Sequence, residues 1–106
     1  EFCESKGIWL ISDDIYHKLV FDGQRWTNPY EFTSKHVDDS RLITINGVSK
    51  AYAMTGWRVG YAMGPKWLTD AMGVVQSHST SGACSIAQAA AATAIVERRG
   101  AGKYCS

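Results

Sequence analysis

Two short apolar runs constrain the fold of this 106-residue chain more than any other feature. Ile8–Ile11 is continuously apolar, and Leu42–Ile45 is rich in β-branched residues. Runs of this kind are typical of strands buried on both faces, as in parallel sheets, because a half-exposed strand alternates polar and apolar residues. Trp57–Met63 is a third candidate strand. The sequence therefore predicts three strands in a sheet whose faces are covered.

Two helices are expected around these strands. Glu1–Lys6 is typical of the end of a helix, and Gly7 is expected to stop it. Gly64-Pro65 opens a second helix, since Pro is favoured in a first helical turn. The apolar side chains of this second helix recur at i, i+3, i+4 and i+7 and form one stripe. They are Leu68, Ala71, Met72 and Val75.

A third helix has the clearest signals. Ser85 is expected to cap it, with Gln88 completing a capping box three residues later, and an Ala-rich run follows. Arg98-Arg99 and Gly100 mark its expected end. Buried strands with helices between them favour an α/β layer architecture.

Composition excludes several classes of partner. Eleven Lys and Arg stand against ten Asp and Glu, and the basic residues are scattered along the chain. We therefore expect no nucleic-acid partner and no polybasic membrane patch. No stretch approaches the ~18 apolar residues of a membrane span. The first residues carry charge, which is unlike a signal peptide.

Cysteine and histidine positions predict no disulfide framework and no metal site. The odd number of cysteines and the absence of a C-x-x-C pair favour free thiols in a reducing compartment, and we expect a cytoplasmic protein. The histidines lack metal-ligand spacing and are interpreted as surface or packing residues. These residues are Cys3, Cys84, Cys105, His17, His36 and His78.

Chemically useful side chains follow the expected strands. Asp13 and Tyr16 follow the first strand, Ser49 and Lys50 follow the second, and Arg58 lies at the start of the third. Ligands in open α/β sheets gather at the carboxyl ends of parallel strands. The chain between the first two strands is long enough for a crossover connection. If these strands are parallel, Asp13 and Lys50 lie at the same edge of the sheet.

These residue types suit a pyridoxal phosphate site. Lys50 is a candidate amine nucleophile, and Arg58 can hold a phosphate through two N–H groups. A carboxylate such as Asp13 keeps a pyridine nitrogen protonated, so that the ring accepts electrons. Spacing alone also allows a solvated lysine, a turn aspartate and an arginine in a structural ion pair.

The residues around Lys50 resemble a longer signature. Gly47–Gly60 reads GVSKAYAMTGWRVG. It resembles the pyridoxal phosphate attachment signature of class I aminotransferases, with every constrained position met. Ile11–Tyr16 resembles the upstream motif of this family, and Ser85–Ala90 resembles the start of a later helix.

The resemblance implies a role for five side chains. Lys50 matches the lysine that forms the Schiff base with the cofactor and moves the proton. Asp13 matches the aspartate at the pyridine nitrogen, and Tyr16 matches the tyrosine that hydrogen-bonds the phenolic oxygen. Arg58 matches the arginine that binds the phosphate. Ser49 lies where a phosphate-contacting hydroxyl is expected.

The resemblance also implies a fold and its extent. Members of this fold type I family are several times longer than this chain. Residues 1–106 are therefore expected to be a central segment of the large, cofactor-binding domain, with a mainly parallel sheet flanked by helices. The N-terminal part of that domain and the C-terminal small domain are expected to be absent. The full-length parent is expected to be a homodimer, and Ala101–Ser106 matches nothing in the family pattern.

The implied function is amine transfer from an amino acid to a 2-oxo acid, with aspartate-type or broad specificity. Two alternatives remain open. One is a lyase or synthase that uses the same cofactor for β-elimination or cyclopropane formation. The other is a truncated, non-catalytic fragment. A partial sheet exposes strand edges and apolar faces, so the isolated chain is expected to be poorly soluble, oligomeric or inactive.

Overall fold

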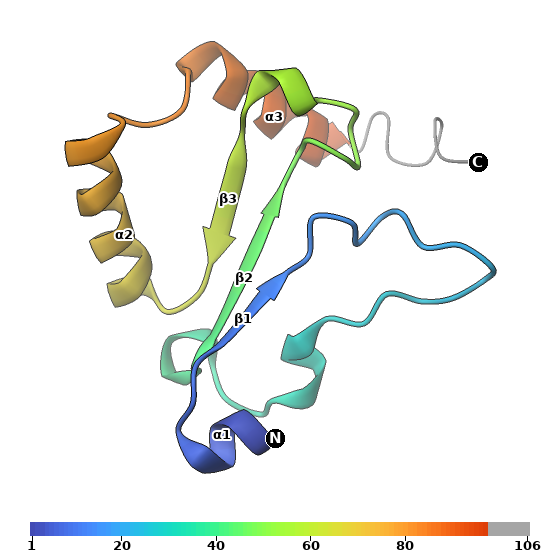
Figure 1. Cartoon of the computed structure of the whole chain (residues 1–106), viewed down its shortest axis with the longest axis vertical. Coiled ribbons are helices and arrows are strands. Elements are labelled where there is room, and N and C mark those ends of the chain that lie inside the picture. The colour runs from blue at the N-terminus through green and yellow to red at the C-terminus, as the bar shows by residue number, and fades with distance from the viewer. Residues whose placement is uncertain (98–106) are drawn as a thin grey trace.

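A three-stranded mixed sheet organises the structure, a computed structural model that describes residues 1–97. The strands are β1 (Leu10–Asp13), β2 (Leu42–Gly47) and β3 (Gly60–Met63), in the order β1-β2-β3 (Figure 1). β1 and β2 are parallel, whereas β2 and β3 are antiparallel. The predicted α/β class is confirmed, but the sheet of the described residues is mixed rather than mainly parallel.

The lengths of the connections explain this topology. Residues 14–41 join β1 to β2 through two 3₁₀ helices, Pro29–Phe32 and Val37–Asp39, and return the chain to the start of the sheet. Residues 48–59 join β2 to β3 with only a 3₁₀ turn, Thr55–Trp57, so the chain reverses direction beside β2. A parallel pair needs a long crossover, whereas a short loop produces an antiparallel pair.

The third strand is shorter than predicted. Trp57 lies in the 3₁₀ turn, and Arg58 follows it with a left-handed backbone at φ 55° and ψ 46°. A residue in that conformation cannot continue an extended strand. The prediction of a strand starting at Trp57 is therefore wrong for its first three residues, and β3 begins at Gly60.

Three α-helices flank the sheet: α1 (Phe2–Lys6), α2 (Lys66–Ser79) and α3 (Ser85–Glu97). In Figure 1, α1 lies near the amino ends of β1 and β2, and α2 lies on the β3 side. Gly7 ends α1 in the left-handed conformation at φ 65°, as predicted. Pro65 directly precedes α2, which also confirms the expected start. No helix among the described residues is long and apolar enough to cross a bilayer.

The predicted cap of α3 is wrong by one residue. Ser85 is the first helical residue, and the carbonyl of Cys84 accepts the N–H of Gln88 at 2.9 Å. The Gln88 amide donates to the carbonyl of Ala83 at 2.7 Å. Cys84 therefore occupies the cap position, and Gln88 reaches past Ser85. Arg98-Arg99 and Gly100, like the rest of the tail with Cys105, lie outside the described residues.

Burial on both faces is confined to the central strand. Every residue of β2 is buried or half-buried, and Leu42 is only 6% exposed. β1 is one of the two edge strands of the described sheet, and Ile11 is 65% exposed. The prediction that Ile8–Ile11 is covered on both faces is therefore wrong within residues 1–97. The stripe predicted on α2 is also mostly uncovered, since Leu68 is only half-buried and the other three residues of the stripe are exposed.

Many large apolar side chains of residues 1–97 are exposed to solvent. Trp67, Val75, Ile86 and Val96 are among the exposed large apolar side chains. Their apolar pattern is that of core-facing elements, but the described residues do not cover them.

Glycine is required at position 47, because the backbone of Val59 and Gly60 lies very close to the end of β2 there. A Cβ placed on Gly47 would lie 2.9 Å from the backbone oxygen of Val59 and 3.2 Å from Ile15 Cδ1. Gly47 pairs with Gly60 across the antiparallel ladder. A side chain at position 47 would therefore push β3 away from β2.

We expect Gly47→Ala to destabilise the protein by about 1–3 kcal/mol, the usual cost of overpacking a closed site. Gly73→Ala is the matched control, because a Cβ there meets nothing within 4 Å. In the interior of α2 it should stabilise by about 0.5–1 kcal/mol. Urea unfolding of both variants measures the difference. Equal stability of the two variants would contradict the close approach at Gly47.

Candidate functional site

The carboxyl ends of β1 and β2 meet at one edge of the sheet (Figure 1). Asp13 pairs with Ile45 in the parallel register, and the N–H of Asp14 donates to the Ile45 carbonyl at 2.8 Å. The loop that carries Ser49 and Lys50 starts directly after β2. The two strand ends therefore lie together, as the parallel arrangement requires.

Tyr16 and Lys50 are in contact at this edge. The chain turns helically after β1, since the N–H of His17 donates to the Asp14 carbonyl at 3.0 Å and that of Leu19 to the Tyr16 carbonyl at 2.8 Å. This turn places the Tyr16 ring so that Lys50 Nζ lies 5.6 Å from its centroid. That distance is within the range of a cation–π contact.

Ser49 and Arg58 line one small hollow beside this pair, with a volume of about 200 Å³. The Ser49 carbonyl accepts the Thr55 hydroxyl at 3.0 Å, and the Arg58 guanidinium donates to the Thr55 carbonyl at 3.1 Å. These bonds close the loop between the two residues. Arg58 forms no ion pair with a carboxylate among residues 1–97. Most of its five N–H donors are therefore free to bind an anion. The lining residues are Ile15, Gly47, Ser49, Arg58, Val59 and Gly60.

Asp13 lies at the same edge but forms no ion pair with Lys50 or Arg58 among the described residues. Its side chain is exposed, and Oδ1 accepts the N–H of Ile15 at 3.3 Å. Oδ2 has no hydrogen-bond partner in the part of the chain that the structure describes. The described contacts thus join Lys50 to Tyr16. One oxygen of Asp13 remains free to accept a hydrogen bond from a further donor.

Asp14 is the buried carboxylate of this segment, and sequence reasoning did not single it out. It is 6% exposed, and its Oδ1 accepts the Ser12 hydroxyl at 2.7 Å. Its Oδ2 is buried without a partner among residues 1–97. Side chains alternate across a strand, which places Ser12 and Asp14 on one face and Asp13 on the other.

Asn46 and His17 form a second link between the two strand ends that the sequence analysis missed. Asn46 is 6% exposed, and its Nδ2 lies 3.0 Å from His17 Nδ1. The His17 ring packs edge-on against Trp26 at 5.3 Å, so its interpretation as a packing residue is confirmed but incomplete. The available signal was the polar Asn46 at the end of an otherwise apolar strand.

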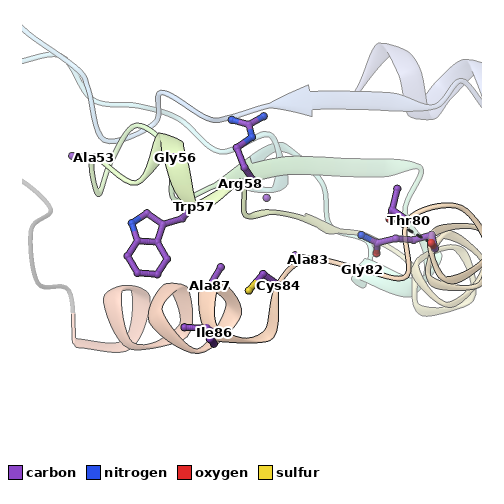
Figure 2. A pocket seen from close by; sticks show the side chains of 12 residues that line it. Ala53, Gly56, Trp57, Arg58, Thr80, Gly82, Ala83, Cys84, Ile86 and Ala87 are labelled. Carbon is purple, nitrogen blue, oxygen red and sulfur yellow. Dashed lines mark hydrogen bonds between the residues drawn. The ribbon is translucent and has the colours of Figure 1, made fainter.

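A larger open cleft of about 840 Å³ lies between the residue 53–58 loop and the start of α3. Figure 2 shows the Trp57 indole directed toward α3 and the Arg58 guanidinium directed away from it. Cys84 Sγ lies at the first turn of α3 in this cleft. Hydrogen bonds from the backbone N–H groups of Ala87 and Ile86 lower the pKa of the Cys84 thiol.

Other groups near the sheet do not form a metal site. Within the described residues, no three His, Cys, Asp or Glu side chains gather in an arrangement that could hold a metal ion. Burial, and to a lesser extent the neighbouring Tyr52, raise the pKa of Tyr61.

The comparisons with known proteins agree with the resemblance seen around Lys50. Residues 1–100 match the family model described as Aminotransferase class I and II. The chain belongs to this family. It is 54% identical over 88 residues to an aspartate/prephenate aminotransferase of Cereibacter sphaeroides and 51% identical over 88 residues to an aspartate aminotransferase of Rhizobium meliloti. These alignments cover 83% of the chain but only 22% and 21% of the two relatives.

Solved structures of the family share this fold. The crystal structure of the Rhizobium meliloti aspartate aminotransferase matches 98% of the chain with a TM-score of 0.82 and 44% identity, over 25% of its own length. An aromatic aminotransferase from Pyrococcus horikoshii matches 93% of the chain with a TM-score of 0.83 and 31% identity, over 26% of its length. The predicted fold type is confirmed, and the chain spans about a fifth to a quarter of the relatives it matches.

We expect Cys84 to be alkylated at lower pH than an ordinary thiol, because its lowered pKa leaves more thiolate at a given pH. Iodoacetamide labelling across pH 6–9 measures this in a variant with Cys3→Ser and Cys105→Ser. A variant that also carries Cys84→Ser is the control and should not be labelled. A labelling midpoint for Cys84 at or above that of free N-acetylcysteine, labelled under the same conditions, would contradict the effect of the helix N–H groups.

Proposed function

We propose that this chain is the cofactor-anchoring part of a pyridoxal phosphate-dependent aminotransferase, which moves the amine of an amino acid to a 2-oxo acid. The observation that carries the proposal is the meeting of Lys50 with Tyr16 at the sheet edge, beside the hollow lined by Ser49 and Arg58. Family membership supports the same conclusion.

The residues at this edge fit pyridoxal phosphate. A phosphate needs N–H and O–H donors in a confined place, and Arg58 and Ser49, whose side chains carry such donors, both line the hollow. The absence of a side chain at Gly47 keeps backbone close to that hollow. Asp13 Oδ2 would accept the pyridine N–H, and the Tyr16 hydroxyl would donate to the phenolic oxygen. When bound, the cofactor supplies an electron sink for bond breaking at the α-carbon of the substrate.

Each of these side chains has a distinct task. Lys50 would hold the cofactor through Nζ, since an amine can act as a nucleophile and can also carry a proton. The Tyr16 ring limits where Nζ can move, because the two groups are in contact. Arg58 is anchored to the Thr55 carbonyl and presents its remaining N–H groups as a preformed fork for a phosphate. Asp13 would offer its free carboxylate oxygen to the ring nitrogen, where a negative charge would favour the protonated form.

The relatives guide the proposed substrate and context. They are named aspartate/prephenate and aspartate aminotransferases, and we extend aspartate-type or broad specificity to this chain. The chain spans only about a fifth of their length. We therefore propose that residues 1–106 are a central segment of the large domain of a cytoplasmic homodimer. The exposed apolar side chains of α2 and α3 support that placement, since such surfaces are normally covered.

The first test concerns Lys50. The protein mixed with pyridoxal phosphate and reduced with borohydride should retain the pyridoxyl absorption, whereas Lys50→Ala should lose nearly all of it. Lys66→Ala is the matched control, because Lys66 lies on α2 and pairs with Asp70 at 2.6 Å. If the wild type and Lys50→Ala retained equal amounts of the pyridoxyl group, Lys50 would not be the residue that binds the cofactor covalently.

The second test concerns Asp13 in the intact protein that carries these residues. Asp13→Asn should keep the cofactor bound but slow proton abstraction by about 10²- to 10⁴-fold, the range of a group acting on proton transfer. Asp22→Asn is the control, because Asp22 lies in a turn with φ 57° that Asn also adopts. Stopped-flow measurement of α-hydrogen loss gives the rate. Unchanged turnover in Asp13→Asn would exclude the electron-sink role.

A further inference from the structure

Two neighbouring residues of the turn after β1 each reach a residue at or after the end of β2. Tyr16 meets Lys50, with 5.6 Å between the ring centroid and Nζ. His17 meets Asn46, with 3.0 Å between His17 Nδ1 and Asn46 Nδ2. The second contact lies directly beside the first, on both chain segments. It therefore influences where the Tyr16 ring lies relative to Lys50.

The hydrogen bonds of Asn46 determine the orientation of its amide. Its Oδ1 accepts the N–H of Gly47 at 2.7 Å, so its Nδ2 points to His17 Nδ1. In the described residues Nδ2 has no other acceptor. His17 Nδ1 must therefore offer a lone pair to Asn46, which places the ring proton on Nε2.

A second neighbour of His17 Nδ1 does not change this assignment. The Asp14 carbonyl also lies 3.0 Å from Nδ1 and would require an N–H there. That carbonyl already accepts the backbone N–H of His17 at 3.0 Å, whereas the buried Asn46 amide would be left without a partner. An unpartnered buried amide is costly, so the lone pair on Nδ1 is favoured.

The surroundings make this bond a rigid one. Asn46 is 6% exposed and lies in the central strand. The Trp26 ring packs against His17 at an interplanar angle of 62° and restricts rotation of the imidazole. The Asp14 N–H also ties the start of the turn to β2 at Ile45. The turn that carries Tyr16 is thus held at both of its ends.

We propose that His17 and Asn46 are positioning residues for the site of the proposed function, on which this inference rests. The neutral Nε2–H imidazole of His17 accepts from Asn46 and holds the Tyr16 turn over Lys50. His17 touches neither cofactor nor substrate in this scheme and acts through Tyr16. Its loss changes the environment that Tyr16 provides for the bound cofactor.

The tautomer can be tested without any cofactor. In protein with ¹⁵N-labelled histidine rings, the His17 resonances, assigned by their loss in His17→Asn, should show a proton on Nε2 and none on Nδ1 at a pH where the ring is neutral. Asn46→Asp replaces the amide donor with an acceptor and should move a proton to Nδ1. A proton on Nδ1 in the wild type would overturn the proposed bond.

The positioning role is tested in the intact protein by the absorption of bound pyridoxal phosphate as a function of pH. A hydroxyl that donates to the phenolic oxygen stabilises its deprotonated form, so Tyr16→Phe should raise the pH midpoint of the absorption change. His17→Leu should raise it by about half a unit or more, and should add almost nothing in the Tyr16→Phe background. His17→Asn places an acceptor where Nδ1 was and should restore the wild-type midpoint. His78→Ala, on the exposed end of α2, is the control and should leave it unchanged.

The outcomes separate the two proposals. A wild-type midpoint in His17→Leu, or a shift that adds fully to that of Tyr16→Phe, would overturn the positioning role alone. No uptake of pyridoxal phosphate by the wild-type protein would overturn the proposed function, and the positioning role with it. Three results together support both proposals. His17→Leu shifts the pH midpoint, His17→Asn keeps the wild-type midpoint, and His17→Leu adds almost no shift in the Tyr16→Phe background.

Discussion

The parallel pairing of β1 with β2 is the interaction on which the rest of the structure depends. It brings two segments that are far apart in the sequence to one edge of the sheet, in a register that pairs Asp13 with Ile45. The contact of Tyr16 with Lys50 and the bond of His17 with Asn46 both follow from that register. A shift of one residue would turn every side chain of β1 to the opposite face and break both links.

The loop between β2 and the antiparallel strand β3 adds Ser49 and Arg58 to the site. The 48–59 loop is short, and Gly47 lets it lie close to β2. Hydrogen bonds through Thr55 then hold Ser49 and Arg58 at one hollow. Local backbone geometry, rather than a large buried core, determines where these donors lie. This suits a segment whose apolar helix faces are left uncovered by the described residues.

Much of the fold could be predicted from local sequence signals. The apolar run at Leu42, the glycine after α1 and the proline before α2 each mark a boundary correctly. Burial could not be predicted in the same way, because Ile11 has the pattern of a buried strand residue but is not covered by any of the described residues. The backbone at Arg58 adopts a left-handed conformation that is rare for a non-glycine residue and interrupts an otherwise strand-like sequence.

The candidate site was predicted unevenly for a similar physical reason. Lys50, Arg58 and their neighbours lie in a long local motif, so their residue types and spacing were readable. Asn46 and His17 are 29 positions apart, and only the parallel pairing brings them together. Their roles, like those of Asp13 and Ser49, remain predictions that mutagenesis and spectroscopy can test.

The most direct measurement of the central claim is the location of the cofactor on the chain. After reduction with borohydride in the presence of pyridoxal phosphate, proteolysis and mass spectrometry identify each lysine that carries the pyridoxyl group. The sheet-edge account predicts that the modification lies on Lys50, at close to one group per chain. Modification spread over Lys18, Lys35 and Lys66, or absent from Lys50, would contradict it.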